Sequence, residues 1–298
     1  MTAPRRALAP PPFLDPPRET LDPARARASV IPVPYDATST WVKGADAGPA
    51  AILDASAQVE WFDHKTRTEP HARGIITLPM IEHAGSPDEL APKVEAIVGG
   101  ELDAGRLPCV LGGEHSVSIG AIRAAAARYP GLTVLQIDAH ADTRETYEGS
   151  ACNHACVMAR AREVARTVQV GIRSLDASEF PALDNATVFW ADDIRRCTRE
   201  ERQSWHHAVV ALCTEQVYLT IDLDAFDPSI IPATGTPEPG GLDWDDVDGL
   251  VTLLARSATI VGFDVVELAP QPGQHASAFT AAKLVHRVFA EALHARET

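Results

Sequence analysis

Short apolar runs recur along the chain between stretches of helical periodicity, and this alternation constrains the fold more than any other feature of the sequence. The runs are rich in Val, Ile and Leu, and most lack the polar–apolar alternation of a half-exposed strand. Such runs are typical of strands that are buried on both faces of a parallel sheet. Strands are therefore expected at residues 29–33, 107–111, 133–138, 168–172, 187–190, 217–222 and 259–265.

The segments between these strands have the spacing of amphipathic helices. Ser86 is expected to cap the first of them, because Glu89 stands three residues later and completes a capping box. Strand–helix–strand repetition favours right-handed connections and an α/β fold in which helices cover both faces of a mostly parallel sheet. Ligands of such folds bind at the carboxyl ends of the strands. Helices are expected at residues 87–104, 116–129, 154–165, 198–212, 244–255 and 276–294.

The N-terminal segment differs from the rest of the chain because proline is concentrated at positions 10–12 and 16–17. Proline fixes φ and lacks an N–H donor, so residues 1–28 are expected to form an extended or mobile tail, part of which can pack on the body. The pattern is uniform from Ser29 onward. Residues 29–298 are therefore expected to form a single domain.

Composition excludes several classes of protein. The net charge of −15 would repel nucleic acid phosphates, so no nucleic acid partner is expected. No apolar run reaches membrane-spanning length, and the N-terminus lacks the apolar centre of a secretory signal. The five cysteines form no tight framework, which fits free thiols in a reducing compartment. These features favour a cytoplasmic enzyme.

Acidic and histidine residues directly follow three of the expected strands. Two of these groups repeat at a spacing of two residues, so an extended backbone would point their side chains to one side. The carboxyl ends of parallel strands meet at one edge of a sheet, which brings the three groups together. The residues are His115, Asp138, His140, Asp142, Asp222 and Asp224.

Four carboxylates and two imidazoles in one cleft require cations to offset their charge. Mixed oxygen and nitrogen ligands suit Mn²⁺ best, and Zn²⁺, Fe²⁺, Co²⁺ or Ni²⁺ also accept them. Six side chains exceed the needs of one catalytic metal, which favours two ions that share carboxylates. Any one of these residues alone is more often a cap, a turn or a core residue. Together they predict a binuclear metal centre.

These segments resemble the ureohydrolase family, which includes arginase, agmatinase, guanidinobutyrase and formiminoglutamase. The similarity covers nearly everything from Ser29 onward. It implies a single three-layer α/β/α domain around a parallel sheet, and a homo-oligomer, commonly a trimer or hexamer. The resemblance is carried by residues 112–116 (GGEHS), 138–142 (DAHAD), 220–228 (TIDLDAFDP) and 232–241 (PATGTPEPGG).

The resemblance implies a ligand set for each of two metal ions, with Mn²⁺ expected in both sites. One ion is expected to be held by His115, Asp138, Asp142 and Asp222. The other is expected to be held by Asp138, His140, Asp222 and Asp224. Asp138 and Asp222 would therefore bridge the two ions.

The resemblance also implies catalytic residues. His154, in the segment 153–158 (NHACVM), aligns with the proton-shuttling histidine of the family. Glu267 aligns with the acid that holds the guanidinium, and Asp142 would accept a hydrogen bond from the attacking hydroxide. Glu267 has independent support, since it directly follows an expected strand. The implied reaction converts a guanidino compound into urea and an amine.

The substrate is indicated by the loop at 143–153, which lacks the Asn- and Ser-rich character of arginases and resembles agmatinases. Agmatine, hydrolysed to putrescine and urea, is therefore the expected substrate. Glu145 or Glu148 would receive its distal ammonium, Arg144 would equally receive a substrate carboxylate, and Thr236 would contact the guanidinium or shape its loop. The three charged residues are explained equally well as side chains of a solvated loop that has no role in substrate binding.

Other functions remain open at this point. A guanidino acid hydrolase of the guanidinobutyrase type is the nearest alternative, followed by an arginase. A non-catalytic relative would bind metal or ligand without turnover, but such proteins usually lose a metal ligand or the proton shuttle. A different two-metal amidohydrolase would release formamide or ammonia in place of urea.

Overall fold

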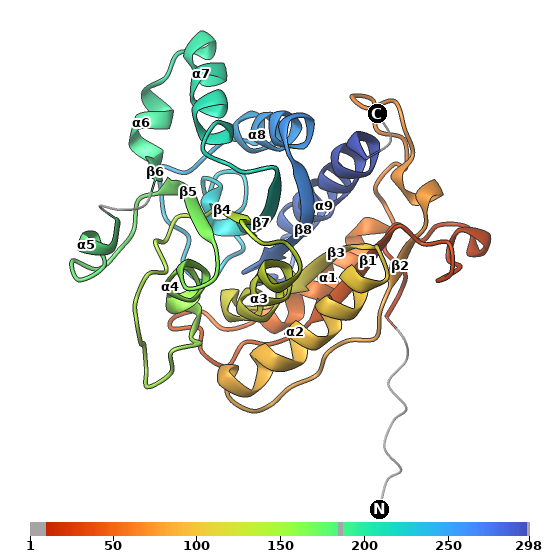
Figure 1. The fold of residues 1–298 in the computed structure, drawn as a ribbon, viewed down its shortest axis with the longest axis horizontal. Helices are drawn as coiled ribbons and strands as arrows, with labels where there is room; N and C mark the ends of the chain where they lie inside the picture. The colour runs from red at the N-terminus through yellow and green to blue at the C-terminus, as the bar shows by residue number, and fades with distance from the viewer. Residues whose placement is uncertain (1–9, 184–186, 297–298) are drawn as a thin grey trace, which may run out of the picture.

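The computed structural model describes residues 10–183 and 187–296. In this part of the chain, eight strands form one sheet in the order β2-β1-β3-β8-β7-β4-β5-β6 (Figure 1). Every pair of neighbouring strands is parallel, which confirms the predicted sheet type. The strands are β1 (Ala28–Val33), β2 (Ile75–Thr77), β3 (Leu107–Gly112), β4 (Thr133–Ile137), β5 (Arg166–Ile172), β6 (Thr187–Trp190), β7 (Gln216–Asp222) and β8 (Thr259–Val266).

Burial explains why the strands have continuous apolar runs. Every residue of β1, β3 and β4 is buried, so both faces of these strands need apolar side chains. All seven expected strands are present, with ends that differ by a few residues. The sequence did not predict β2, because a strand of three residues is too short to have a recognisable period.

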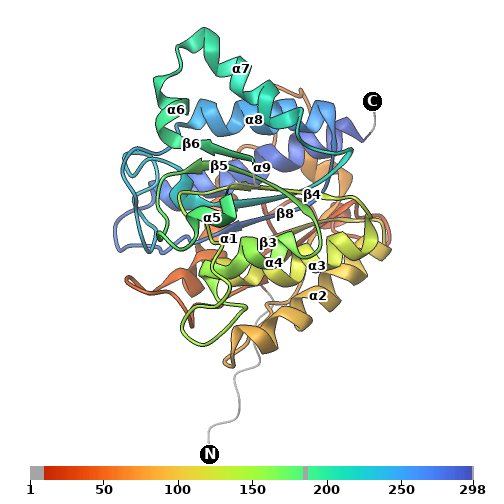
Figure 2. The same cartoon turned by 60° about the vertical axis from the view of Figure 1, so that its left-hand side comes forward.

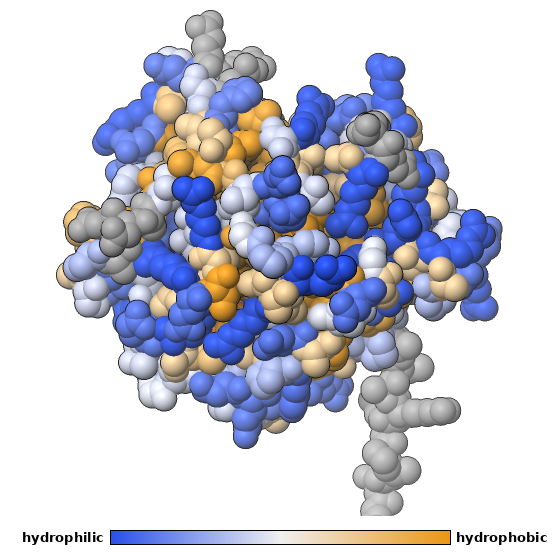
Figure 3. Space-filling view, in the orientation of Figure 1, coloured by the Kyte–Doolittle hydropathy of each residue, from blue (hydrophilic) through white to orange (hydrophobic). Residues whose placement is uncertain are grey.

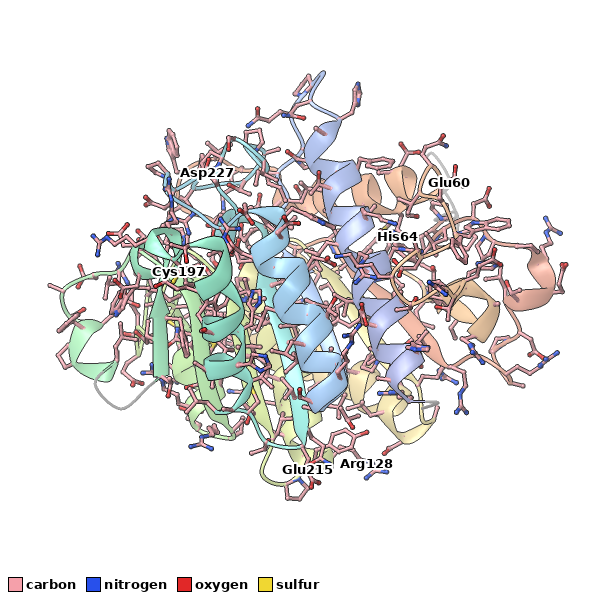
Figure 4. The ribbon with its side chains drawn as sticks, turned by 90° about the horizontal axis from the view of Figure 1, so that it is seen from above. Glu60, His64, Arg128, Cys197, Glu215 and Asp227 are labelled. Atoms are coloured by element: carbon pink, nitrogen blue, oxygen red, sulfur yellow. The ribbon has the colours of Figure 1, made fainter. Side chains whose placement is uncertain are left out.

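Helices cover both faces of the sheet, as Figure 2 shows. On one face, α2 (Pro87–Asp103) packs against α3 (Ser118–Arg128), which also contacts α4 (Val157–Arg162). On the other face, α9 (Ala276–Ala295) packs against α8 (Trp244–Ser257), and both lie in front of the sheet in Figure 4. One hydrophobic core lies on each side of the sheet. The predicted three-layer α/β/α architecture is confirmed.

The helical predictions hold for the long segments. The capping box of Ser86 and Glu89 is present at the start of α2, and α7 (Arg199–Val210) begins with a similar box at Thr198. The helix expected at 154–165 is a 3-10 turn (His154–Cys156) followed by α4. Three helices were not predicted: α1 (Gly48–Ser56), which packs on α9, α5 (Phe180–Leu183) and α6 (Ala191–Arg196).

The described part of the N-terminal segment packs on the body of the protein. Phe13 and Leu14 are buried in the core, and the Phe13 ring lies 5.9 Å from that of Phe289 in α9. The backbone N–H groups of Phe13 and Leu14 donate to the hydroxyls of Thr77 and Ser56. Residues 1–9 of the expected tail lie outside the described residues. We propose that residues 29–298 form the domain and that this segment is its N-terminal extension.

The face of the molecule seen in Figure 3 is mainly polar, and hydrophilic residues surround smaller apolar patches there. In residues 10–183 and 187–296, no helix is long and apolar enough to cross a membrane. All five cysteines are free thiols, as expected.

Candidate metal centre and active site

Four neighbouring strands carry the expected metal ligands and catalytic acids to one edge of the sheet. In the strand order these are β3, β8, β7 and β4, the central four strands. Figure 4 marks the two ends of β7, with Glu215 at its amino end and Asp227 just beyond its carboxyl end. The site lies at the carboxyl end, beside the turns that follow these strands.

The expected metal ligands form two groups that share one carboxylate. His115 Nδ1 lies 2.9 Å from Asp142 Oδ2 and 3.1 Å from Asp138 Oδ2. His140 Nδ1 lies 3.0 Å from Asp224 Oδ2 and 3.7 Å from Asp138 Oδ1. Asp138 belongs to both groups, which is the position of a bridging ligand.

Asp222 lies beside the first of these groups. Its Oδ2 atom is 3.6 Å from His115 Nδ1, and its Oδ1 atom accepts a hydrogen bond from the Asp224 N–H at 2.8 Å. The side chain is almost completely buried. The structure therefore brings together all six residues that the sequence indicated as metal ligands.

One buried atom supports a cation at this position. His115 Nδ1 is buried and has no hydrogen-bond partner among the described residues, although three carboxylates surround it within 3.6 Å. Buried polar atoms in native proteins almost always have a partner. A divalent ion among these oxygens would supply one, because neutral imidazole and carboxylate are its usual ligands. The residues present therefore fit a metal centre.

The other ring nitrogen of His115 is held by a chain of hydrogen bonds below the site. Its Nε2 atom lies 2.8 Å from the Thr220 hydroxyl, which donates to Asp264 Oδ1 at 2.7 Å. Tyr218 donates to the other oxygen of Asp264 at 2.9 Å. Because the single proton of Thr220 is directed at Asp264, the Nε2–H of His115 donates to Thr220. This arrangement leaves the Nδ1 lone pair for a metal.

Without a cation, the charges of the centre are balanced by protons. Burial, and then the charge of Asp142, raises the pKa of Asp138 to about 7. Burial alone would keep the His115 ring neutral, but Asp138 and Asp142 raise its pKa well above the ordinary value. Burial likewise opposes the charge of His140, and Asp224 raises the pKa of that ring to about 10. Metal ions would take the place of these protons.

Asp142 and Glu267 have backbone conformations that non-glycine residues rarely adopt. Their φ angles are 52° and 67°, in the left-handed region, which costs of order 1–3 kcal/mol per residue. Hydrogen bonds hold both backbones in place. The Asp142 carbonyl accepts the N–H of Met158 at 2.9 Å, and the Glu267 N–H donates to the Gly113 carbonyl at 2.7 Å. Strain of this kind is typical of functional positions.

Glu267 lies directly beyond β8, as expected, and lines the pocket. Its Oε1 atom accepts the backbone N–H of His115 at 2.7 Å, which connects it to the metal centre. Burial, followed by the charges of Glu114 and Asp224, raises the pKa of Glu267 well above its ordinary value. A bound guanidinium would favour the charged carboxylate.

His154 lines the same pocket, at the start of the turn that Asn153 caps. Its Nδ1 atom lies 3.0 Å from the Thr38 hydroxyl, and its ring is nearly perpendicular to the neighbouring Tyr147 ring. Burial lowers the pKa of His154, although Asp142 and Glu114 oppose this effect. The ring is therefore biased toward its neutral form.

The four expected substrate residues separate into two pairs. Arg144 and Thr236 line the pocket, and the Thr236 hydroxyl lies 3.4 Å from Asp224 Oδ2. Glu145 pairs with Arg160 at 2.6 Å on the surface, and Glu148 is exposed on a turn. Neither glutamate belongs to the described lining of the pocket. The expectation that one of them receives a substrate ammonium stays a prediction, and both side chains are exposed to solvent.

Several pocket residues were not predicted from the sequence. Asp176 and Glu179 follow β5, and the rule that ligands bind at strand ends would have indicated them. Trp41 and Val42 reach the pocket from a loop that follows β1. Trp41 is 72% exposed there, so it does not belong to a buried apolar pattern that would have indicated it in the sequence.

The charge of Arg144 is already compensated. Its Nε atom lies 3.5 Å from Glu179 Oε2, and its guanidinium stacks 4.5 Å above the centre of the Tyr147 ring. Glu179 is buried and also accepts hydrogen bonds from the N–H and hydroxyl of Thr143. Asp176 contributes a further carboxylate to the pocket lining. The acidic groups near Arg144 therefore outnumber the cation.

The parallel α/β fold and the clustered His and Asp side chains are typical of metal-dependent hydrolases. The chain belongs to the arginase family: the Arginase family model matches residues 26–290. This family depends on two metal ions and hydrolyses guanidino compounds. The predicted resemblance and the prediction that the chain is an enzyme are confirmed at this level.

Similar proteins are named N(1)-aminopropylagmatine ureohydrolase or agmatinase. The chain is 37% identical to the N(1)-aminopropylagmatine ureohydrolase of Synechocystis sp., over 89% of each chain. It is 30% identical to the agmatinase of Pyrococcus horikoshii, over 90% of this chain and 93% of the relative. Among solved structures, the agmatine ureohydrolase of Thermoplasma volcanium is 29% identical, with a TM-score of 0.87 over 98% of both chains.

Proposed function

We propose that the chain releases urea from a guanidino compound with a cationic tail, of which agmatine is the simplest. One observation carries the proposal. One pocket is lined by five of the expected metal ligands together with Glu267, the expected guanidinium partner, and His154, the expected proton carrier. The ligand side chains in its lining are His115, His140, Asp142, Asp222 and Asp224.

The metal ions are proposed to be Mn²⁺, bound by the two ligand sets given above. Asp138 and Asp222 would belong to both sets, and the place of Asp138 in both groups supports this sharing. When bound, the ions would lower the pKa of a water molecule and offset negative charge that develops during its attack. The mixture of imidazole and carboxylate ligands suits Mn²⁺.

The residues of the chain would perform the remaining steps. Glu267 would orient the planar guanidinium by charge-assisted hydrogen bonds. Asp142 would accept a hydrogen bond from the water that attacks the central carbon, and the two protons of that water would pass to the departing nitrogen. His154 Nε2 would hold the proton that passes to the departing amine as the carbon–nitrogen bond breaks. The products are urea and the protonated amine.

The charges of the pocket favour a cationic tail. A guanidino acid or arginine would need a free cation for its carboxylate, but Arg144 is engaged by Glu179 and Tyr147. Asp176 offers a carboxylate that suits an ammonium. These contacts favour agmatine over guanidinobutyrate and arginine.

N(1)-aminopropylagmatine is the second candidate substrate. The Synechocystis relative, which has this name, is more similar to the chain than the P. horikoshii agmatinase. The extended substrate carries an additional ammonium, which the acidic pocket would also accept. Both candidates would yield a polyamine, so we propose a role in polyamine biosynthesis.

The test is urea release by Mn²⁺-loaded protein with agmatine, N(1)-aminopropylagmatine, guanidinobutyrate and arginine in parallel. The proposal expects kcat/KM to be highest for one of the first two. A preference for guanidinobutyrate or arginine would contradict the cationic tail. No urea from any of them, also after loading with Ni²⁺, Fe²⁺ or Zn²⁺, would overturn the ureohydrolase activity.

The assembly and location of the protein are proposed as well. We propose a homo-oligomer, a trimer or a hexamer, in the cytoplasm. Light scattering coupled to size-exclusion chromatography tests the assembly, and a monomer would contradict it.

A further inference from the structure

We infer that Glu114 and Thr38 form a relay that fixes the His154 ring, with Nδ1 protonated and Nε2 left to the reacting groups. Thr38 and Glu114 are then positioning residues, because they act through His154. The role of this relay in catalysis rests on the proposed function, in which His154 holds a proton.

The relay begins at a buried carboxylate. Glu114 has no exposed surface. Its Oε1 atom accepts the Thr38 hydroxyl at 2.6 Å, and its Oε2 atom accepts the Thr38 N–H at 2.5 Å. The Ser116 hydroxyl also donates to Oε1 at 2.6 Å. The carboxylate therefore binds both the backbone and the side chain of a residue 76 positions away.

The direction of these hydrogen bonds determines the tautomer of His154. A hydroxyl has one proton to donate, and a carboxylate can only accept. The Thr38 proton is therefore directed at Glu114, and the lone pairs of its oxygen face His154. Because His154 Nδ1 lies 3.0 Å from that oxygen, Nδ1 must carry a proton and donate it. In the neutral ring, Nε2 is then the unprotonated nitrogen.

The same contacts restrict the orientation of the ring. The backbone N–H of His154 lies 3.4 Å from the Thr38 oxygen, so one hydroxyl receives two groups of the same residue. The Tyr147 ring packs nearly perpendicular to the His154 ring, with 5.8 Å between the ring centres. A flip of the ring would put the carbon Cδ2 in the place of Nδ1, so the hydrogen bond to Thr38 would be lost, and Nε2 would exchange places with Cε1. The relay therefore selects the orientation that can take up a proton and release it at Nε2.

Thr38 can be changed without loss of the loop around it. Asp36 Oδ2 accepts the N–H groups of Gly44 and Ala45 at 2.6 and 3.1 Å, which closes this loop independently of Thr38. Valine has nearly the shape of threonine, and it retains the backbone N–H that donates to Glu114. Thr38→Val therefore removes the hydroxyl alone, and Thr38→Ser retains it.

The first test measures the tautomer of His154 directly by NMR. Protein labelled with ¹⁵N-histidine and loaded with diamagnetic Zn²⁺ would be studied by long-range ¹H–¹⁵N correlation, with His154 assigned from the His154→Asn spectrum. We expect the Nδ1–H tautomer in the wild-type protein and in Thr38→Ser, and a mixture or the Nε2–H tautomer in Thr38→Val. Ser116→Ala is the matched control, because it removes the other hydroxyl on Glu114 and should leave the tautomer unchanged. An Nε2–H tautomer in the wild-type protein, or no change in Thr38→Val, would overturn the relay.

The second test measures its effect on catalysis. Loss of a residue that orients a catalytic group typically lowers activity by about 10- to 100-fold, so kcat of Thr38→Val should fall by this factor while KM changes little. Thr38→Ser should recover most of the rate. A changed tautomer with unchanged kcat would overturn the role in proton delivery. A wild-type protein that releases no urea but has the Thr38-dependent tautomer would overturn the proposed function and leave the relay intact.

Discussion

The Thr220 hydroxyl lies 2.8 Å from Nε2 of His115 and connects this ring to the buried Asp264. Thr220→Val should weaken Mn²⁺ binding by about 10- to 100-fold, because the ring loses the acceptor that directs its Nδ1 lone pair at the metal. Calorimetric titration of the metal-free protein measures the affinity. Thr220→Ser retains the hydroxyl and should bind Mn²⁺ like the wild type. Equal affinities for the Val and Ser variants would contradict this role.

Glu267→Gln should separate substrate binding from metal binding. Its amide oxygen can still accept the His115 N–H, so the Mn²⁺ content should not change. The charge-assisted contact with the guanidinium is lost, and hydrogen bonds to charged groups contribute about 1.5–3 kcal/mol, so kcat/KM for agmatine should fall by roughly 10- to 150-fold. Kinetics and metal analysis of the same sample check both statements. A loss of Mn²⁺ with the activity would assign Glu267 to the metal centre.

Asp176→Asn should raise KM for agmatine, because the pocket loses a carboxylate that attracts the ammonium. The group is exposed to solvent, so an increase of about two- to fivefold is expected, and it should shrink at high salt. Steady-state kinetics at two ionic strengths measure it. Glu148→Gln removes the same charge outside the pocket lining and should leave KM unchanged. Equal effects of both variants would indicate attraction by the overall charge alone.

The buried Asp63 should make stability depend on pH in the acid range. Burial disfavours its charge, but the Thr66 N–H and the Arg287 guanidinium lower its pKa to about 2. Because the folded pKa lies below the unfolded value near 4, the stabilisation is present above pH 4 and is lost as the pH falls toward 2. About 2 kcal/mol is expected from a shift of this size. Urea unfolding of metal-free wild type and Asp63→Asn at pH 6 and pH 3 measures the difference, and parallel losses in the two proteins would contradict it.

Arg287→Met should be among the most destabilising substitutions outside the site. The buried guanidinium donates to Asp63, Asp248 and Glu291, and its removal leaves three buried acids without their shared cation. Breaking a buried ion pair from one side costs about 3–5 kcal/mol. Arg128→Met is the control, since Arg128, which is labelled in Figure 4, pairs at 3.8 Å with the exposed Asp103. The control should change the free energy of unfolding by less than about 1 kcal/mol.

The sequence predicted the sheet type and the metal ligands because both depend on local pattern. His115, Asp138 and Asp222 follow continuous apolar runs, and the ends of parallel strands meet at one edge. The strand order could not be predicted, because hydrophobic pattern does not determine which strands are neighbours. The structure adds that β3, β8, β7 and β4 are adjacent, which brings the ligands within a few ångströms.

The substrate pocket was less predictable because it depends on how loops fold. Glu145 and Glu148 are close to Asp142 in sequence, but both are exposed and neither belongs to the described lining of the pocket. Thr38 reaches His154 across 116 positions, and no local pattern marks such a contact. Element boundaries follow hydrophobic periodicity, whereas loop contacts depend on individual hydrogen bonds between distant segments.

The position of β7 and β8 has a consequence for how the protein is made. These two strands are the last to be synthesised, yet they lie between β3 and β4, which were made much earlier. A nascent chain that ends before residue 216 has no strand to fill this gap, so β3 and β4 each present an unpaired edge that can associate with other chains. Asp222, Asp224 and Glu267 also arrive only with these strands. The metal centre therefore cannot be completed during most of translation, and insertion of the last two strands closes the sheet and assembles the site together.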